Sequence, residues 1–419
     1  MPGINYREMQ KMKGAMTSRE FIAEVCSAFD PKVEGHLEPA DLSLFETACV
    51  CFGERRVLDA RRDPQVLLTE AGDGVDSTAF AEITGRVVTT RMIDEYELAI
   101  GPANELVTTE PNITNDLERK PGFAGLGDVA EPIQEGLPYP RVGFGEDYQD
   151  MPRGHKYGLI VPITREAVFF DRTGQVLERA GKVGEVLGYR KAREIYQMVL
   201  GITSNYNWQG TAYDTYYPGA AGNPWTNIHS QNLVDWTNID IAEQLFQSMT
   251  DPNTSQPISI GGRQIGVMPA AYANALRILN AMDVRHTTAG GVVTVSPNPK
   301  SARSYTLIDM GVLCRAEAAA THDFGTPNEL WWLGDFKKAF SYRENWPIQT
   351  LRAPPNAQDE WDRDIVAQFK GTERGVAAVS NPRYMLISSG TCGHSSSGET
   401  LCTPDTWPAI DSAGGTATR

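Results

Sequence analysis

The 419-residue sequence lacks several features that would mark a membrane protein, a secreted protein or a metalloprotein. It has no uninterrupted run of about 18 apolar residues, which a membrane-spanning helix requires. Its polar N-terminal stretch does not resemble a secretory signal peptide. The six cysteines are dispersed, and the spacing in Cys49-Val50-Cys51 is wrong for a zinc knuckle. We therefore expect a protein made in the cytoplasm, with no membrane segment and no metal.

Basic charge is also scarce. The chain has 38 Lys and Arg against 53 Asp and Glu, a formal net charge of −15, and no cluster of basic residues. A groove that grips nucleic acid needs clustered positive charge to neutralise phosphates. The composition argues against such a groove, although an acidic subunit can still surround DNA that it contains without gripping.

Catalytic signatures are missing as well. The glycine-rich run 122–128 precedes no helix and has no P-loop lysine, and the six histidines show no metal-binding spacing. Acidic residues at 359, 360, 362 and 364 fit the first turns of a helix, where negative charge is favourable. Trp331 and Trp332 are interpreted as core or interface aromatics. We predict no catalytic, cofactor-binding or metal-binding residues, and no cofactor.

Helical periodicity dominates the first part of the chain and returns near its middle. Apolar spacing predicts a helix that begins with Ser18 as its N-cap, a second helix over 42–58, and a short extended piece followed by an amphipathic segment over 77–99. The longest helix is expected over 171–200, which contains no proline. Its glycines at 181, 184 and 188 reduce helix propensity, so we expect another element to pack closely on that face.

Residues 106–160 contain many Gly and Pro and few apolar side chains for each turn signal, so we expect no compact core from their middle section. Strand-forming residues at the two ends, 106–109 and 157–163, predict a long two-stranded arm that leaves the body and returns. A two-stranded ribbon is only marginally stable alone in water, so this arm needs a neighbouring surface.

The remaining elements are expected to mix helices and strands. We predict a helix over 238–251, a strand and then a helix over 263–282, strands within 292–326, two strands over 329–353, a helix over 358–375 and a final strand over 377–388.

Four stretches stand in a distinctive order. They are YGLIVPITREAVFFD (157–171), the long helix, IGVMPAAYANALRILNA (265–281), and the pair at 333–351 and 362–387. In this order they resemble the major capsid proteins of tailed bacteriophages with the Hong Kong 97 fold, especially the group near the Mu-type major head subunit. Together with the arm, the resemblance covers about residues 75–388.

The resemblance implies an α+β fold with an N-terminal helical arm, an extended β-hairpin loop, a long spine helix, and peripheral and axial domains. The expected divisions are a helical N-terminal extension (1–75), an N-arm (76–105), the extended loop (106–164), the spine helix of the peripheral domain (165–202), the axial domain (203–327), the completion of the peripheral domain (328–388) and a C-terminal tail (389–419). In many family members a protease removes an N-terminal scaffolding segment. Residues 1–75 are assigned instead to shell decoration or subunit contacts, and the sequence leaves their cleavage open.

The implied function is structural. A major capsid protein of this kind self-assembles into hexamers and pentamers of an icosahedral shell, which encloses double-stranded DNA without sequence-specific binding. Its expected partners are other copies of the chain, a portal, and decoration or scaffolding proteins. Its expected place is the virion, after assembly in the host cytoplasm. Two alternatives remain: the shell of an encapsulin-type nanocompartment with protein cargo, and an uncharacterised enzyme that uses the tryptophans.

Charged residues near the expected loop are candidates for contacts between subunits. Glu118, Arg119 and Lys120 are suited to charge pairs with a neighbouring copy. In one branch of the family, a lysine there forms an isopeptide bond with an asparagine of a neighbour, for which Asn356 or Asn381 is available. A disulfide between Cys392 and Cys402 and a cross-link at Lys120 both stay open at this stage.

Overall fold

The chain forms two compact units, each assembled from separate stretches of sequence. The first comprises Met1–Gly101, His155–Lys191 and Glu344–Gly375; the second comprises Pro102–Gly154, Ala192–Arg343 and Val376–Arg419. The computed structural model describes residues 6–29, 43–52, 57, 74–115, 118–122, 147–164, 166, 170, 173–203, 206–217, 224–229, 231–250, 263–287, 293–300, 305–321, 327–353 and 365–388. It contains both helices and sheets, as the predicted α+β class requires.

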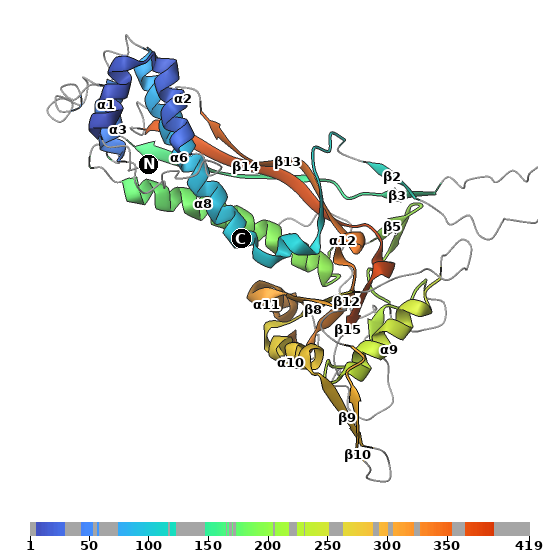
Figure 1. Ribbon diagram of the computed structural model, residues 1–419. Helices are drawn as coiled ribbons and strands as arrows, with labels where there is room; N and C mark the ends of the chain where they lie inside the picture. Colours follow the sequence, from blue (N-terminus) through green and yellow to red (C-terminus); the bar gives the residue numbers. More distant parts are fainter. Residues whose placement is uncertain are drawn as a thin grey trace, which may run out of the picture. The chain divides into compact units, whose positions relative to one another are not determined.

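The N-terminal part of the first unit is helical, as predicted. Helices α1 (Tyr6–Ala15), α2 (Ser18–Ala28) and α3 (Leu44–Phe52) gather beside α6 (Gly74–Ile100), as Figure 1 shows. The predicted N-cap at Ser18 is wrong by one residue. Thr17 is the cap, because its hydroxyl accepts from the backbone N–H of Glu20 while the Glu20 carboxylate accepts from the Thr17 N–H, 3.1 Å away.

The predicted extended piece after residue 76 is also wrong, because α6 is one continuous helix from Gly74 to Ile100. Its first half contains many β-branched residues, which favour strands by propensity alone. Ile83, Val87 and Val88 are nevertheless at most 2% exposed, and they lie on a helical face buried in the apolar cluster of the first unit. Burial of that face outweighs the local preference.

Helix α8 (Thr173–Val199) confirms the predicted long helix. The close partner expected on its glycine face is α6. A Cβ atom added at Gly184 would lie 2.1 Å from the carbonyl oxygen of Met92, and one added at Gly188 would lie 2.6 Å from that of Tyr96. Only glycine permits this approach of two helix backbones, which explains why α8 tolerates the propensity cost.

A four-stranded sheet has the strand order β1–β13–β14–β4. Its strands are β1 (Thr108–Glu110), β13 (Phe340–Arg352), β14 (Ile365–Val379) and β4 (His155–Thr164). The two predicted ends of the arm therefore do not pair with each other: β1 pairs with β13 and β4 pairs with β14. The helix expected over 358–375 is wrong for residues 365–375. These residues form a strand, because their backbone pairs with almost the whole length of β4.

The second unit contains a five-stranded sheet of order β11–β8–β12–β15–β7. The strands are β11 (Thr306–Asp309), β8 (Gln264–Val267), β12 (Trp331–Gly334), β15 (Met385–Ser388) and β7 (Ile228–His229), and the accompanying helices are α9 (Trp236–Gln247), α10 (Pro269–Asn280), α11 (Gly311–Thr321) and the one-turn α12 (Phe336–Ala339). The predicted α9, the β8–α10 succession and the two strands over 329–353 are confirmed. Residues 311–321 are helical instead of extended.

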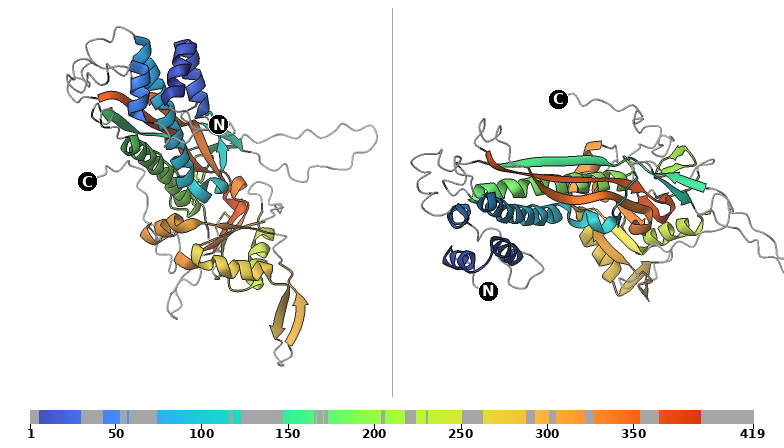
Figure 2. Two further views of the ribbon diagram at one scale, coloured as in Figure 1. Left: turned by 60° about the vertical axis from the view of Figure 1, so that its left-hand side comes forward. Right: turned by 90° about the horizontal axis from the view of Figure 1, so that it is seen from above.

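Apolar contact between the helices and this sheet makes the core of the second unit. The cluster contains Ile239 and Phe246 of α9, Ile278 of α10, and Trp331 and Leu333 of the central strand. Beyond α10, strands β9 (Asp283–Thr287) and β10 (Val293–Pro297) form a separate two-stranded ribbon, visible in Figure 2.

The contact between α6 and α8 gives a direct test. We expect Gly184→Ala to lower the free energy of unfolding by about 1–3 kcal/mol or more, because the new methyl group collides with the backbone of α6. Gly174→Ala on the same helix is the matched control, since nothing lies within 4 Å of its Cβ position. The control should be neutral or stabilise by up to about 1 kcal/mol. Chemical denaturation of both variants checks this, and equal effects at the two glycines would contradict the close approach.

Candidate functional site

Two strands within the predicted loop (106–164) pair with each other in a small sheet of the second unit. Strand β2 (Arg119–Gly122) pairs antiparallel with β3 (Asp147–Asp150), and the sheet continues through β5 (Tyr206–Trp208) to β6 (Thr211–Tyr213). The paired strands therefore form the root of an arm whose intervening residues, 123–146, lie outside the described part. Because β3 also pairs with β5, this root is tied to a sheet and is not a free ribbon.

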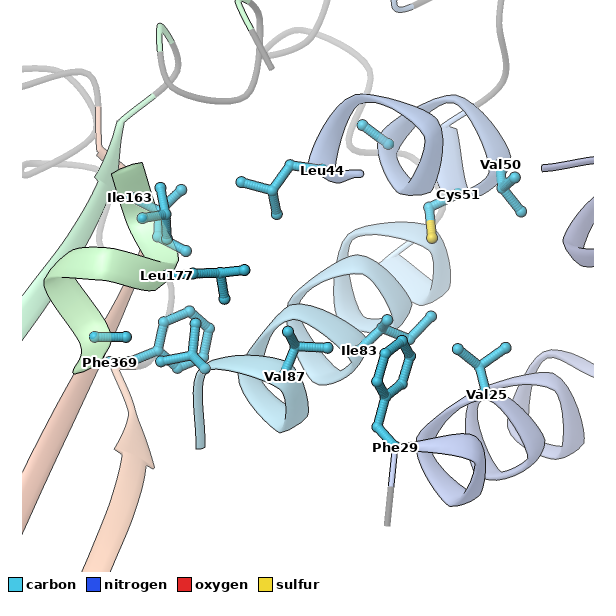
Figure 3. Packing of buried hydrophobic residues seen from close by; sticks show 14 of the residues in the cluster. Val25, Phe29, Leu44, Val50, Cys51, Ile83, Val87, Ile163, Leu177 and Phe369 are labelled. Carbon is cyan, nitrogen blue, oxygen red and sulfur yellow. The ribbon is translucent and has the colours of Figure 1, made fainter. Parts of the chain in front are cut away.

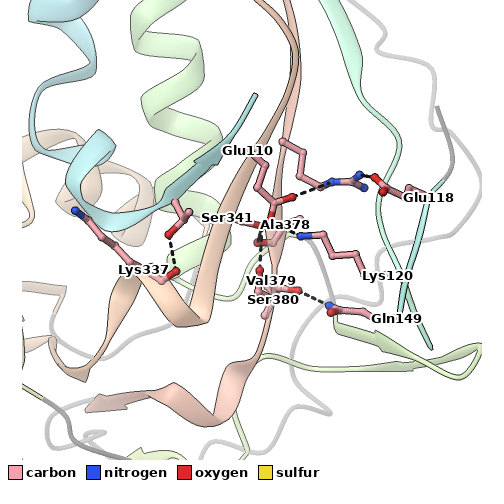
Figure 4. Close-up of polar contacts among 11 residues, drawn as sticks. Glu110, Glu118, Lys120, Gln149, Lys337, Ser341, Ala378, Val379 and Ser380 are labelled. Atoms are coloured by element: carbon pink, nitrogen blue, oxygen red, sulfur yellow. Dashed lines mark hydrogen bonds and ion pairs between the residues drawn. The ribbon is translucent and has the colours of Figure 1, made fainter. Parts of the chain in front are cut away.

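A group of four charged side chains lies at the root of the arm. This root cluster consists of Arg343 on β13, Glu110 on β1, Glu118 just before β2 and Lys120 on β2. Arg343 Nη2 is paired with the Glu118 carboxylate, and its Nε lies 3.7 Å from Glu110. Lys120 Nζ contacts the other oxygen of Glu110. Figure 4 shows the side chains of Glu110, Glu118 and Lys120 close together, with dashed lines for the ion pairs of the cluster.

The burial of Arg343 explains why this cluster can hold β2 in place. The Arg343 side chain is only 4% exposed, while Glu110 and Glu118 are partly exposed, at 28% and 35%. A desolvated guanidinium is tolerated only where carboxylates are held against it. Two cations face two anions here, so the charges balance. The start of β2 is therefore held in one position, because moving it away would leave the buried Arg343 guanidinium without the Glu118 carboxylate.

Neutral hydrogen bonds hold the returning strand in the same place. The buried Gln149 side chain donates from Nε2 to the Val379 carbonyl at 2.6 Å. The Met151 N–H donates to the Glu118 carbonyl at 3.1 Å, and the Gln209 N–H donates to the Tyr148 carbonyl at 3.0 Å. Both strands of the root are thus anchored by contacts that come from distant parts of the sequence.

The three charged residues singled out from the sequence are all found at this root. Within the chain, Glu118 pairs with Arg343, Lys120 with Glu110, and Arg119 with Asp150 at 2.8 Å. Their contact with a neighbouring subunit stays a prediction. Sequence reasoning missed Arg343 and Gln149, whose partners lie 225 and 230 positions away in the chain. No local pattern signals a pairing over that distance.

Other candidates from the sequence are resolved in different ways. Trp331 and Trp332 are both fully buried, which confirms the core interpretation. Asn381 caps a short helical turn by accepting from the Arg383 N–H. The glycine-rich run beyond Gly122, the acidic residues 359–364, Asn356, Cys392 and Cys402 lie outside the described residues.

Two further observations concern the described part only. It contains no group of three or more His, Cys, Asp or Glu side chains arranged to hold a metal ion. Within the same residues, no helix is both long enough and apolar enough to cross a bilayer.

Comparisons with known proteins give one family match. A family model described as phage capsid protein matches residues 151–388, more than half of the chain. No curated protein matches the sequence.

Solved structures of shell proteins show some likeness. The capsid of the cyanophage P-SCSP1u is 12% identical over 68% of this chain and 86% of its own, with a TM-score of 0.41. The capsid of a native GTA particle is 11% identical over 69% and 89%, with a TM-score of 0.39. The SrpI encapsulin of Synechococcus elongatus is 11% identical over 73% and 93%, with a TM-score of 0.37.

The root cluster gives a second test. We expect Arg343→Met to loosen β2, because the Glu118 carboxylate loses its cation and Glu110 keeps only Lys120. The loss should exceed what an exposed pair contributes, about 1 kcal/mol or less, since the Arg343 side chain is buried. Hydrogen exchange should accelerate in residues 118–122 and 147–150. Arg119→Met is the control: its side chain is 68% exposed, and an exposed pair contributes about 1 kcal/mol or less. Adding Glu118→Gln to Arg343→Met should recover part of the loss. Similar exchange in the Arg343 and Arg119 variants would contradict the anchoring role.

Proposed function

The chain belongs to the phage capsid protein family, and from that membership we propose that it is the major capsid protein of a tailed bacteriophage, a shell subunit that encloses packaged double-stranded DNA. The match over residues 151–388 carries the proposal, since it extends from just before β4 to the end of β15. The family assignment made from the sequence is confirmed by this match.

The arm provides the means of joining subunits. Its middle section, within residues 123–146, is rich in Gly and Pro, and holding such a segment in one conformation costs roughly 1–2 kcal/mol of conformational entropy per residue. We propose that it lies over an adjacent subunit, where extended backbone adds to an existing surface. The root cluster would then determine where each arm leaves its own subunit. Glu118, Arg119 and Lys120 are proposed to form ion pairs with charged residues of a neighbouring subunit.

Hexamers and pentamers are built from the same chain in this proposal. Residues 203–327 are proposed as the axial domain around the capsomer centre, and 165–202 together with 328–388 as the peripheral domain, except that strands β12 and β15 complete the sheet that contains β8 and β11 of the axial domain. Each contact need not be strong, because every subunit makes several contacts and the shell closes as a whole. The acidic net charge of −15 suits a container that holds DNA without gripping it.

The role proposed is structural and not enzymatic. The partners are further copies of the chain, a portal, and decoration or scaffolding proteins. The mature location is the virion, reached after assembly in the host cytoplasm. An encapsulin-type compartment differs in its contents, so particles purified after co-expression with the phage packaging partners should contain DNA. Particles that hold only protein cargo would favour the encapsulin alternative.

Shortening the arm tests its role in assembly. Residues 124–145 are replaced by a short Gly-Ser linker that leaves β2, β3 and the root cluster in place. We expect a folded, soluble subunit that no longer builds stable shells, because the segment that reaches a neighbour is gone. Circular dichroism and unfolding curves check the fold, and electron microscopy with sedimentation checks assembly.

A control variant separates the length of the arm from its side chains. It carries a Gly-Ser segment of the same length in place of residues 124–145. Restored assembly in this control would show that reach alone matters. Shells of normal stability from the shortened chain would contradict the proposal, and an unfolded subunit would place the arm within the core.

A further inference from the structure

The three N-terminal helices lie outside the stretch that matches the capsid family, which begins at residue 151. An extension of this kind is a candidate for a scaffold that a protease removes during maturation. A removable segment must leave behind a folded unit with little newly exposed apolar surface, since large exposed apolar patches promote association. The contacts of α1, α2 and α3 can be compared with that requirement.

Side chains of α2 and α3 belong to the main apolar cluster of the first unit. Phe21 and Val25 of α2 and its C-cap residue Phe29 are at most 2% exposed, as is Leu44 of α3. The same cluster contains side chains from four elements that follow the N-terminal helices, namely α6, β4, α8 and β14: Ile83, Val87, Val88, Met92, Val161, Ile163, Val176, Leu177, Ala180 and Phe369. Figure 3 shows Leu44 near Leu177 and Ile163, and Phe29 near Ile83. The N-terminal helices thus form one side of a shared core.

Polar contacts join the same elements. The backbone N–H of Leu44, at the start of α3, donates to Thr173 Oγ1 at 2.8 Å, and this buried contact ties α3 to the first residue of α8. The Lys13 ammonium group of α1 donates to the carbonyls of Val50 and Cys51 at 2.8 Å each. These carbonyls lie in the last turn of α3, where a cation is favourable. Helix α3 is therefore held to α8, and α1 to α3, by specific hydrogen bonds as well as by apolar packing.

Removing α1–α3 would uncover the apolar first turns of α8, part of α6 and the inner face of β4. We infer that these helices are a permanent layer of the shell subunit, and that proteolytic removal of α1–α3 is not a step in its maturation. They hold the beginning of α8 against α6. Without them, a transient scaffold would have to position these two helices. This inference rests on the proposed capsid function.

The mass of the chain in finished particles tests the inference directly. Intact-mass analysis of the subunit from purified, DNA-filled particles should recover the full 46.0 kDa chain. A subunit that begins near residue 74 would overturn the inference and leave the capsid function standing. A failure to form any particle would count against the function instead, and the next experiment would then decide the inference.

That experiment uses the full-length chain in solution and needs no assembly. Phe21→Ala removes a ring that is 1% exposed from α2, while the control Glu24→Ala alters an exposed position of the same helix. If the core is shared, Phe21→Ala should reduce amide protection in β4, β14 and the start of α8, on the order of a hundredfold. Protection lost in α1–α3 alone, with β4 and β14 unchanged, would identify a detachable appendage and overturn the inference. The control should leave all of these elements unchanged.

Discussion

The first unit depends on the approach of α6 to α8. Gly184 allows the α8 backbone to reach the carbonyl of Met92, and this distance leaves no room for any side chain. Once the two helices are this close, Val87 and Leu177 bury their side chains in one cluster with Phe369 of the sheet. The strands β4 and β14 and the N-terminal helices complete that cluster from other sides. Widening the contact would expose apolar surface on every one of these elements, which couples their stabilities.

The arm root of the second unit uses a different kind of interaction. Apolar packing is non-directional, whereas an ion pair at a desolvated guanidinium requires particular partners in a particular geometry. The buried Arg343 guanidinium is stable only where the carboxylates of Glu110 and Glu118 both lie against it. Such a pair contributes little net stability compared with an apolar core, but it discriminates strongly among alternative positions of β2.

Local sequence patterns succeeded where one side of an element is apolar along its length and failed where distant pairing decided the backbone. The long helix α8 and the succession of β8 and α10 were predicted, because periodic apolar spacing and Pro269 mark them locally. Residues 365–375 were assigned to a helix, yet they form a strand. Their ladder with β4 joins positions about two hundred residues apart, and no local spacing reveals such a partner. The extended piece expected at the start of 77–99 is part of α6 instead, because burial of one helical face outweighed β-propensity.

The sequence by itself determined the family, the mixed fold class and the place of the long helix. These properties follow from the order of elements and from apolar periodicity, both of which are written along the chain. Tertiary structure alone decided which charges meet at the root and which elements share the N-terminal core. Arg343 and Glu118 are separated by 225 positions, and Leu44 and Thr173 by 129. Contacts of this range arise only when the whole backbone is arranged, because each residue carries a preference for burial or for a counter-charge but no information about which distant residue will satisfy it.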